Sequence, residues 1–434
     1  MAKLDAPRIV TSRRDLEDGH TLSRYLATGG YQSLRTALGM SPADVAAEVD
    51  AASLLGRGGA GFPAGRKWSM LRKADLAYLV VNGDESEPAT FKDRLLMERD
   101  PHQLVEGIVI SAWALQVTMA FVYVRGEFAL GLERVTQAVN DAYAHGALGR
   151  DIFGSGFSLD LVVHPGAGAY ICGDETGLLE SLEGKRGFPR IKPPFFPAVM
   201  GLYGEPTVVN NVETLSNVPW IVANGGRAFA ALGQGRSTGT RLFALSGRVR
   251  RPGVYELEMV HNTFRDLIFD PALGGGTTDD VAIKAIIPGG VSSPWFGTDL
   301  LDVPLGQDEV AEHHSMLGSG SVVVIGAHDC AVRAAWRITK FFQRESCGQC
   351  TPCREGAGWL ERILRRIEQG AGRHEDVDLL LDVCDNIAPG LGWPAQQTTI
   401  CPLGPSIPSS IVSAISMCKA EFAAHVDEGR CPSA

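Results

Sequence analysis

Leu79-Val-Val-Asn-Gly-Asp-Glu-Ser-Glu-Pro88 is the stretch from which the fold can be read. Its first three residues are apolar and β-prone, and three of the four residues 84–87 are acidic. Carboxylates are costly to bury without partners, and ligands bind at the carboxyl ends of parallel strands in α/β sheets. The stretch therefore predicts a buried strand followed by a ligand-binding loop, although a solvated loop would have the same composition.

Strand-like and helix-like runs alternate after this stretch. The β-prone runs Phe121–Val124 and Leu161–Val163 are preceded by Gln103–Leu115 and Phe128–Tyr143, of which the second keeps helical spacing of its apolar residues. Such alternation is typical of a parallel sheet covered by helices on both faces. We therefore expect an α/β fold with a parallel, Rossmann-like sheet in a domain spanning residues 56–235.

Three further segments complete the predicted organisation. Residues 1–55 are expected to form a mostly helical lead-in. Residues 240–325 carry turn signals so densely that a small β-rich α+β domain is expected there. Apolar residues then recur at helical spacing in four runs, which predicts a four-helix bundle over residues 326–434.

Composition excludes several classes of protein. The chain has 434 residues, enough for about three domains, and 40 basic against 50 acidic residues give a net charge of −10. That balance is a poor match for nucleic acid or an anionic bilayer. The longest apolar stretch, Ile110–Val124, is too short to span a membrane, and no secretory signal opens the sequence. A soluble cytoplasmic protein without direct membrane insertion is expected.

The cysteines are the sharpest local signal. Eight of the nine lie between Cys330 and Cys431. Cys347, Cys350 and Cys353 are spaced C-x₂-C-x₂-C, a pattern that with one remote cysteine commonly holds a [4Fe–4S] cluster, because each iron takes one thiolate. Structural zinc sites more often pair two C-x₂-C units, so a cluster is the favoured interpretation and zinc the alternative.

The remote ligand has four candidates. Cys401 lies in a loop directly before a proline, whereas Cys384 and Cys418 lie on apolar helical stripes, where a cysteine is usually a small buried hydrophobe; Cys431 is the fourth. Cys172, outside the cluster, is expected to be structural.

Two glycine-rich segments flank the predicted strands. Gly56-Arg-Gly58-Gly-Ala-Gly61 matches G-x-G-x-x-G but follows a helical run, so the ordinary dinucleotide fingerprint is excluded by its context. Glycines nevertheless let backbone N–H groups approach a phosphate or a flat ring, and Lys67 offers a cation nearby. Ligand binding and a tight structural turn both remain open for this loop.

The second glycine-rich segment directly follows a predicted strand. It spans residues 166–177 and contains Asp174 and Glu175, and it is followed by Lys192-Pro-Pro-Phe195 and by the pair Asn210-Asn211. Aromatic rings can stack on a planar ligand, and the asparagines can donate to phosphate or flavin oxygens. Together with the acidic loop, this segment predicts a nucleotide-binding site.

In this order the motifs resemble the family of F subunits, the flavin subunits of NADH:quinone oxidoreductase (respiratory complex I). The matching blocks span residues 56 to 404: GRGGAGFPAGRKWS, NGDESEPATFKDR, GAGAYICGDETGLLESLEGKRG, KPPFFPA, PTVVNNVETL, SCGQCTPCREG and TTICPLG. The resemblance implies an FMN, a [4Fe–4S] cluster on Cys347, Cys350, Cys353 and Cys401, and a ubiquitin-like (SLBB) identity for the β-rich domain.

The resemblance also implies two sets of nucleotide contacts. NADH would meet Phe62, Glu87, Glu175, Lys192 and Phe195. FMN would be held by Gly56, Arg57, Gly58, Gly59, Lys67, Asn82, Asp84, Glu85, Ser86, Tyr170, Gly173, Asp174, Glu175, Val209, Asn210, Asn211 and Thr214.

The activity implied is that of an NADH dehydrogenase without a catalytic side chain. FMN would accept hydride from NADH and pass single electrons to the cluster, toward quinone. Glu87 and Glu175 would favour NADH over NADPH, because a carboxylate at the 2′-OH repels a 2′-phosphate. Implied partners are a thioredoxin-like [2Fe–2S] subunit and a larger iron–sulfur subunit, at the inner face of the plasma membrane.

Two positions depart from the family pattern. Asp174 stands where relatives usually carry Glu, in G-E-E-T-A, and Met70 stands where many relatives carry an aromatic residue. The first is expected to alter a contact near the flavin, and the second to leave one wall of the nucleotide pocket less stacked.

Other functions are compatible with parts of the sequence. The nearest is the diaphorase subunit of an NAD-linked hydrogenase or formate dehydrogenase; the short cysteine-free lead-in favours complex I over it. A zinc-stabilised ligand-binding protein would leave the glycine and acidic loops unexplained. A degenerate scaffold subunit is disfavoured by the intact cysteine set.

Overall fold

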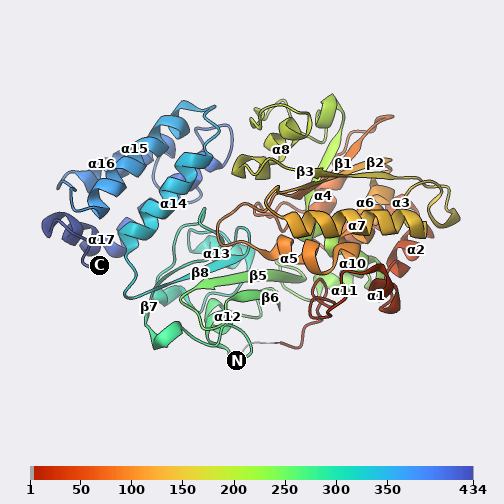
Figure 1. The fold of residues 1–434 in the computed structure, drawn as a ribbon, viewed down its shortest axis with the longest axis horizontal. Coiled ribbons are helices and arrows are strands. Elements are labelled where there is room, and N and C mark those ends of the chain that lie inside the picture. The colour runs from red at the N-terminus through yellow and green to blue at the C-terminus, as the bar shows by residue number, and fades with distance from the viewer. Residues whose placement is uncertain (1–3, 434) are drawn as a thin grey trace.

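The computed structural model describes residues 4–433, which form two four-stranded sheets and a helical bundle (Figure 1). The first sheet is entirely parallel in the order β3-β2-β1-β4. Its strands are β1 (Tyr78–Gly83), β2 (Met119–Val124), β3 (Asp160–Pro165) and β4 (Thr207–Asn211). The predicted parallel α/β fold is thereby confirmed, and the three predicted β-prone runs lie in β1, β2 and β3.

Helices connect these strands. The predicted run 103–115 lies in α6 (Pro101–Leu115). The predicted run 128–143 matches α7 (Ala129–His145), for which Phe128 is the N-cap residue. β4 was not predicted as a strand, because its sequence Thr-Val-Val-Asn-Asn is short and half polar. The helices of this unit are α4 (Ala64–Ser69), α5 (Lys92–Arg99), α6 (Pro101–Leu115), α7 (Ala129–His145), α8 (Glu175–Leu182), α9 (Val212–Ser216), α10 (Val218–Asn224) and α11 (Gly226–Ala230).

The lead-in packs against this unit as α1 (Leu22–Ala27), α2 (Gln32–Leu38) and α3 (Pro42–Ala51). Helix α3 starts with a common capping arrangement, in which the Ser41 hydroxyl accepts from the Asp44 N–H and a proline occupies the first turn. Glu106 of α6 accepts from the N–H groups of Tyr31 and Leu34 at the start of α2. The lead-in and the parallel sheet therefore share one buried core.

The second sheet is mixed, in the order β6-β5-β8-β7, with β5 and β8 parallel at its centre. A capping box between Thr263 and Asp266 starts the short helix α12. This is the small β-rich α+β fold expected from the turn signals. Its elements are β5 (Thr240–Gly247), β6 (Gly253–Glu258), α12 (Phe264–Phe269), β7 (Ile283–Ile287), α13 (Gln307–Glu312) and β8 (Ser321–Gly326).

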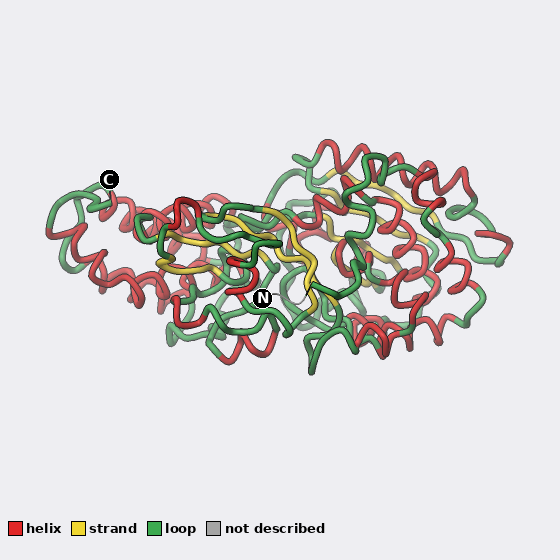
Figure 2. The backbone as a smooth tube through the Cα atoms, turned by 90° about the horizontal axis from the view of Figure 1, so that it is seen from below, coloured by secondary structure: helices red, strands yellow, loops and turns green. Residues whose placement is uncertain are grey.

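The predicted four-helix bundle is confirmed and lies at one end of the elongated molecule (Figure 2). Its helices are α14 (Ala331–Glu345), α15 (Thr351–Glu368), α16 (Asp376–Ile387) and α17 (Leu403–Asp427). One apolar core joins the bundle to Val80 of β1 and Ile171. Short 3-10 helices also occur: η1 (Ile152–Gly154), η2 (Tyr170–Gly173), η3 (Leu202–Gly204), η4 (Thr278–Asp280) and η5 (Thr298–Leu300).

Across residues 4–433, no helix combines the length and the apolar character that a membrane span needs.

Candidate functional site

The predicted ligand-binding loops meet at the carboxyl edge of the parallel sheet. The acidic loop follows β1, and the second glycine segment follows β3 and leads into η2. The side-chain amide of Asn82 donates to the backbone oxygen of Gly173 at 2.9 Å. A Cβ on Gly173 would lie only 3.5 Å from the backbone oxygen of Asp84. The topology therefore brings together two loops that lie far apart in the sequence.

The first glycine loop lies over the end of β4. It closes on itself through the Gly56 N–H, which donates to the Phe62 oxygen at 2.9 Å. A Cβ on Gly58 would lie 3.1 Å from the Cβ of Asn211, while a Cβ on Gly59 would meet no atom within 4 Å. Gly59 has a φ of 136°, a conformation that side chains rarely adopt. The loop thus presents bare backbone to open space, as close approach of a flat ring requires.

Lys67 and Lys192 converge on one carboxylate. Glu175 accepts from Lys67 Nζ at 3.1 Å and from Lys192 Nζ at 3.0 Å, and Lys67 also donates to the Val209 oxygen at 3.1 Å. Burial alone would raise the pKa of Glu175, but the two ammonium groups outweigh burial and lower it. Glu175 is therefore a carboxylate at neutral pH.

Asp84 provides an unsatisfied buried oxygen. Its Oδ2 accepts from the Ser86 hydroxyl at 2.6 Å, whereas its Oδ1 has no hydrogen-bond partner among the described residues. Burial raises the pKa of Asp84 to about 6. Because such a group is costly without a partner, its free oxygen suits a hydrogen-bonding ligand at this edge.

Glu87 is held by a loop of the β-rich domain. It accepts from the Tyr170 hydroxyl at 2.7 Å, the Ser292 N–H at 2.8 Å and the Ser292 hydroxyl at 3.0 Å. Burial raises the pKa of Glu87, and the hydrogen bonds from these donors offset only part of the rise. Both oxygens are engaged, so a ribose hydroxyl could bind Glu87 only by sharing or replacing one of these contacts. Ser292 was not predicted from the sequence, where the Pro288-Gly-Gly turn was the available signal.

Two side chains that were predicted to contact the nucleotide point into the protein interior. The Arg57 guanidinium is fully buried and donates to the oxygens of Thr238 and Thr240 at 2.8 and 2.9 Å. Glu85 accepts from three backbone N–H groups, of residues 92 to 94, at the start of α5. Glu85 therefore caps a helix, and Arg57 ties the first glycine loop to β5.

The Asn210-Asn211 pair and Thr214 are also engaged. Asn210 accepts from the Trp68 indole at 2.9 Å, and the Asn211 amide donates to Asp93 at 2.6 Å. The Thr214 hydroxyl accepts from the Arg57 N–H at 2.8 Å. These contacts fix the first glycine loop and α4 on the end of β4.

The departure at Asp174 has a structural reason. Its Oδ1 accepts from the Thr176 and Gly177 N–H groups at 2.9 and 3.0 Å, so Asp174 is the N-cap of α8. Asp is a preferred N-cap residue. A Cβ on Gly177 would lie 2.5 Å from the Ile171 oxygen, so η2 packs directly on the first turn of α8.

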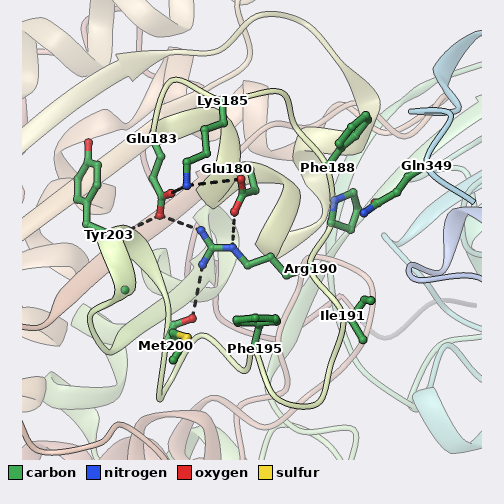
Figure 3. Close-up of a pocket in the computed structure, with 12 residues that line it drawn as sticks. Glu180, Glu183, Lys185, Phe188, Arg190, Ile191, Phe195, Met200, Tyr203 and Gln349 are labelled. Atoms are coloured by element: carbon green, nitrogen blue, oxygen red, sulfur yellow. Dashed lines mark hydrogen bonds and ion pairs between the residues drawn. The ribbon is translucent and has the colours of Figure 1, made fainter.

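A wide cavity lies beside α8, and none of its lining residues belongs to the acidic loop or to the two glycine-rich segments. It measures about 710 Å³, and Figure 3 shows Arg190 within it, between Glu180 and Glu183. Phe195 lines this cavity and is 37% exposed, similar to Phe62 at 38%. Met70, the other departure from the family pattern, is 54% exposed.

Four cysteines line a second, small cavity at the end of the bundle that meets η2. Cys347, Cys350, Cys353 and Cys401 surround it together with Ile171. Burial raises the pKa of Cys401 to about 12, so an ionised thiolate there needs a positive charge beside it, as iron provides. Four cysteines around one space match a [4Fe–4S] cluster, in which each iron takes one thiolate.

Helix η2 touches both sites. The Tyr170 N–H donates to Glu345 at the end of α14 at 2.9 Å, and Ile171 lines the cysteine cavity. Gly173, three residues beyond Tyr170, accepts from Asn82 at the end of β1 and lies against Asp84 of the acidic loop. A single short helix therefore separates the candidate nucleotide site from the cysteine cavity.

The chain matches two family models and a series of curated proteins. Residues 49–220 match the Nuo51 FMN-binding domain, and residues 333–425 match the NADH-ubiquinone oxidoreductase-F iron-sulfur binding region. The NADH-quinone oxidoreductase F 2 subunit of Rhizobium meliloti is 49% identical over 421 residues, which are 96% of this chain and 97% of that protein. The chain belongs to the family of NADH-quinone oxidoreductase F subunits. It carries that family's FMN-binding domain and its iron–sulfur region, and as one subunit of a complex it acts with partner chains.

The same fold occurs in hydrogenases. The NADP-reducing hydrogenase subunit HndC of Solidesulfovibrio fructosivorans is 42% identical over 98% of this chain and 85% of that protein. One solved chain of an NAD+-reducing [NiFe]-hydrogenase is similar in structure, with a TM-score of 0.82 and 32% sequence identity. The match covers 93% of this chain and 66% of the hydrogenase chain.

Proposed function

We propose that this chain is the entry point for electrons from NADH in a quinone-reducing complex. FMN, when bound, accepts the two electrons of a hydride and releases them singly to a [4Fe–4S] cluster. The observation that carries the proposal is η2, whose residues contact the acidic loop on one side and the cysteine cavity on the other. η2 would then join the residues that hold FMN to the residues that hold the cluster.

The residues of the chain bind and orient. The bare backbone around Gly59 lets a flat ring approach, and the free oxygen of Asp84 offers a hydrogen bond to it. The exposed rings of Phe62 and Phe195 are available for stacking. Cys347, Cys350, Cys353 and Cys401 would each bind one iron of the cluster.

Coenzyme choice would depend on Glu175. It is ionised, and a carboxylate near the 2′-position repels the 2′-phosphate of NADPH. Glu87 would contribute less than the sequence predicts, because Tyr170 and Ser292 already occupy its oxygens. We therefore infer a preference for NADH, carried mainly by Glu175.

Domains, partners and location complete the proposal. Residues 56–235 would form the nucleotide domain, 240–325 a ubiquitin-like module and 326–434 the cluster domain, after the lead-in 1–55. A thioredoxin-like [2Fe–2S] subunit and a larger iron–sulfur subunit would take the electrons onward. The assembly would lie on the cytoplasmic face of the plasma membrane.

The test is anaerobic reconstitution of the full chain with FMN, iron and sulfide. We expect about one flavin and four irons per chain, with bleaching of the flavin by NADH. A colourless protein that binds neither isoalloxazine nor iron would contradict the proposal.

A diaphorase role is the second candidate, supported by the similarity to HndC over 98% of this chain. Purification of the native complex distinguishes the two. Quinone-reductase subunits in the preparation would support the first role, and hydrogenase or formate dehydrogenase subunits would support the second.

A further inference from the structure

Three buried side chains gather at the far end of the helical bundle. Cys330, His425 and Cys431 each direct one ligand atom to a common point, and these atoms all lie within 4.8 Å of one another. The three residues are 8%, 0% and 6% exposed. Cys330 Sγ lies 3.3 Å from His425 Nε2. Nothing in the nucleotide site or the cysteine cavity uses this group.

The imidazole of His425 has the orientation that a metal-binding histidine requires. His425 Nδ1 lies 2.7 Å from the backbone oxygen of Glu421, an acceptor, so Nδ1 carries the proton. The lone pair of Nε2 therefore faces the two sulfurs. A ligating histidine typically donates its other ring N–H to a backbone carbonyl or a carboxylate in this way.

A backbone donor already faces the sulfur of Cys330. Its Sγ accepts from the Arg333 N–H at 3.2 Å, which makes Cys330 the N-cap of α14. This N–H offsets only part of the effect of burial, which raises the pKa of the Cys330 thiol to about 12, so a bound cation would have to supply the rest of the stabilisation of a thiolate. The carboxylate of Glu421 is already paired with Lys284 at 2.6 Å and accepts from the Ala331 N–H at 2.8 Å, so it is not free to act as a ligand.

This group is separate from the cluster cage. Cys330 precedes α14 and Cys347 follows it. A helix of 15 residues is about 22 Å long at 1.5 Å per residue. The two sets of cysteines therefore lie at opposite ends of the same helix.

We propose that Cys330, His425 and Cys431 bind one zinc ion, with a water molecule as the fourth ligand. Two thiolates and one neutral imidazole are a known zinc ligand set, and bond lengths of about 2.3 and 2.0 Å at a tetrahedral angle put sulfur and nitrogen about 3.5 Å apart. The two thiols lose their protons on binding, so the zinc and its protein ligands are neutral overall.

The zinc ion would hold two distant segments of the chain together. Cys431 lies four residues beyond the end of α17, and Cys330 lies four residues beyond the end of β8. Zinc would therefore fasten the segment after α17 to the joint between the β-rich domain and the bundle. Lys284 of β7 bonds across the same joint to Glu421.

The experiment uses the full chain with its flavin and cluster in place, so that the other four ligand cysteines are occupied. Zinc content is measured together with the zinc-edge X-ray absorption spectrum. The variants are Cys431→Ser and His425→Gln, with Cys418→Ser as the control, a cysteine on α17 outside the group.

We expect about one zinc per chain, surrounded by two sulfurs at about 2.3 Å and two lighter atoms at about 2.0 Å. Cys431→Ser and His425→Gln should lose at least about 90% of the zinc and keep iron and flavin, whereas Cys418→Ser should keep all three. Retained flavin and iron show that a variant is folded.

Three outcomes would overturn the proposal. The first is a wild-type chain without zinc after purification in zinc-containing medium. The second is zinc with four sulfur neighbours that survives Cys431→Ser, which would place it in the cluster cage. The third is a disulfide between Cys330 and Cys431 in protein kept anaerobic and reduced, detected by mass spectrometry after thiol alkylation.

Discussion

The cysteine cavity and the nucleotide site, though joined by η2, are built in opposite ways. In the cavity, four thiols face one space, and their protein partners are neutral: Cys350 accepts from the Ile400 N–H at 3.3 Å, and Cys353 lies 3.2 Å from the Ser346 hydroxyl. In the nucleotide site, two acidic side chains already have partners: Glu175 pairs with two lysines, and Glu87 accepts hydrogen bonds from Tyr170 and Ser292. The cysteine cavity can accept an iron–sulfur cluster with little rearrangement. The nucleotide site must exchange internal contacts for ligand contacts, so its variants should alter selectivity more than occupancy.

The largest effect is expected for Cys401→Ser. Loss of the remote ligand should reduce bound iron from about four per chain to almost none, and abolish quinone reduction by the assembled complex. Bleaching of the flavin by NADH should continue, because the nucleotide site does not depend on this loop. Iron analysis and rapid-mixing spectroscopy measure the two effects.

Cys418→Ser serves as the control, since it removes a thiol that does not line the cavity. Equal loss of flavin and iron in Cys401→Ser would show that the two sites depend on each other, contrary to this expectation.

Asp84→Asn should stabilise the flavin-free chain. The pKa of Asp84 is raised from its ordinary 3.8 to about 6, so the folded state retains a proton that the unfolded state has lost between these values. Its contribution to stability therefore falls as pH rises from about 4 to about 6, by up to about 3 kcal/mol. Above pH 6 the variant should unfold at higher temperature than the wild type, and below pH 4 this advantage should vanish.

The same substitution should weaken FMN binding if the free oxygen of Asp84 meets the flavin. Fluorescence titration with FMN measures this effect. Unchanged affinity would remove Asp84 from the flavin contacts.

Glu175→Gln should shift coenzyme choice. Removing the charge leaves Lys67 and Lys192 free to meet a 2′-phosphate, so kcat/KM for NADPH relative to NADH should rise about tenfold, equivalent to about 1.4 kcal/mol. Glu127→Gln, an exposed acid after β2 at the same sheet edge, provides the control. If the variant shows no relative gain with NADPH, Glu175 does not determine the choice of coenzyme.

The smallest effect is expected at the cap of α8. Asp174→Ala removes the acceptor for the Thr176 and Gly177 N–H groups and should cost about 1 kcal/mol, whereas Asp174→Asn keeps a capping oxygen and should cost less. Thermal unfolding of the two variants measures the difference. Equal losses would show that charge near η2, and not capping, is what Asp174 supplies.

Local patterns explain what could be predicted. The runs of β1, β2 and β3 are apolar enough to identify buried strands, and helical spacing identified the bundle. β4 was missed because two of its five residues are asparagines, whose roles depend on the neighbouring glycine loop and on Trp68. Ser292 was missed because it contacts Glu87 from 205 residues away in sequence.

The sequence determined the parallel sheet and three cysteines at C-x₂-C-x₂-C spacing, because hydrophobic period and thiol spacing are local properties of the chain. The order of its motifs identified the family, and that resemblance implied Cys401 as the fourth cysteine. Only the tertiary structure decided which of the predicted side chains are engaged by other parts of the protein. It turned Arg57 and Glu85 inward, made Asp174 a helix cap and gathered Cys330, His425 and Cys431. A side chain's role depends on donors and acceptors brought to it by distant segments, and no local spacing records these.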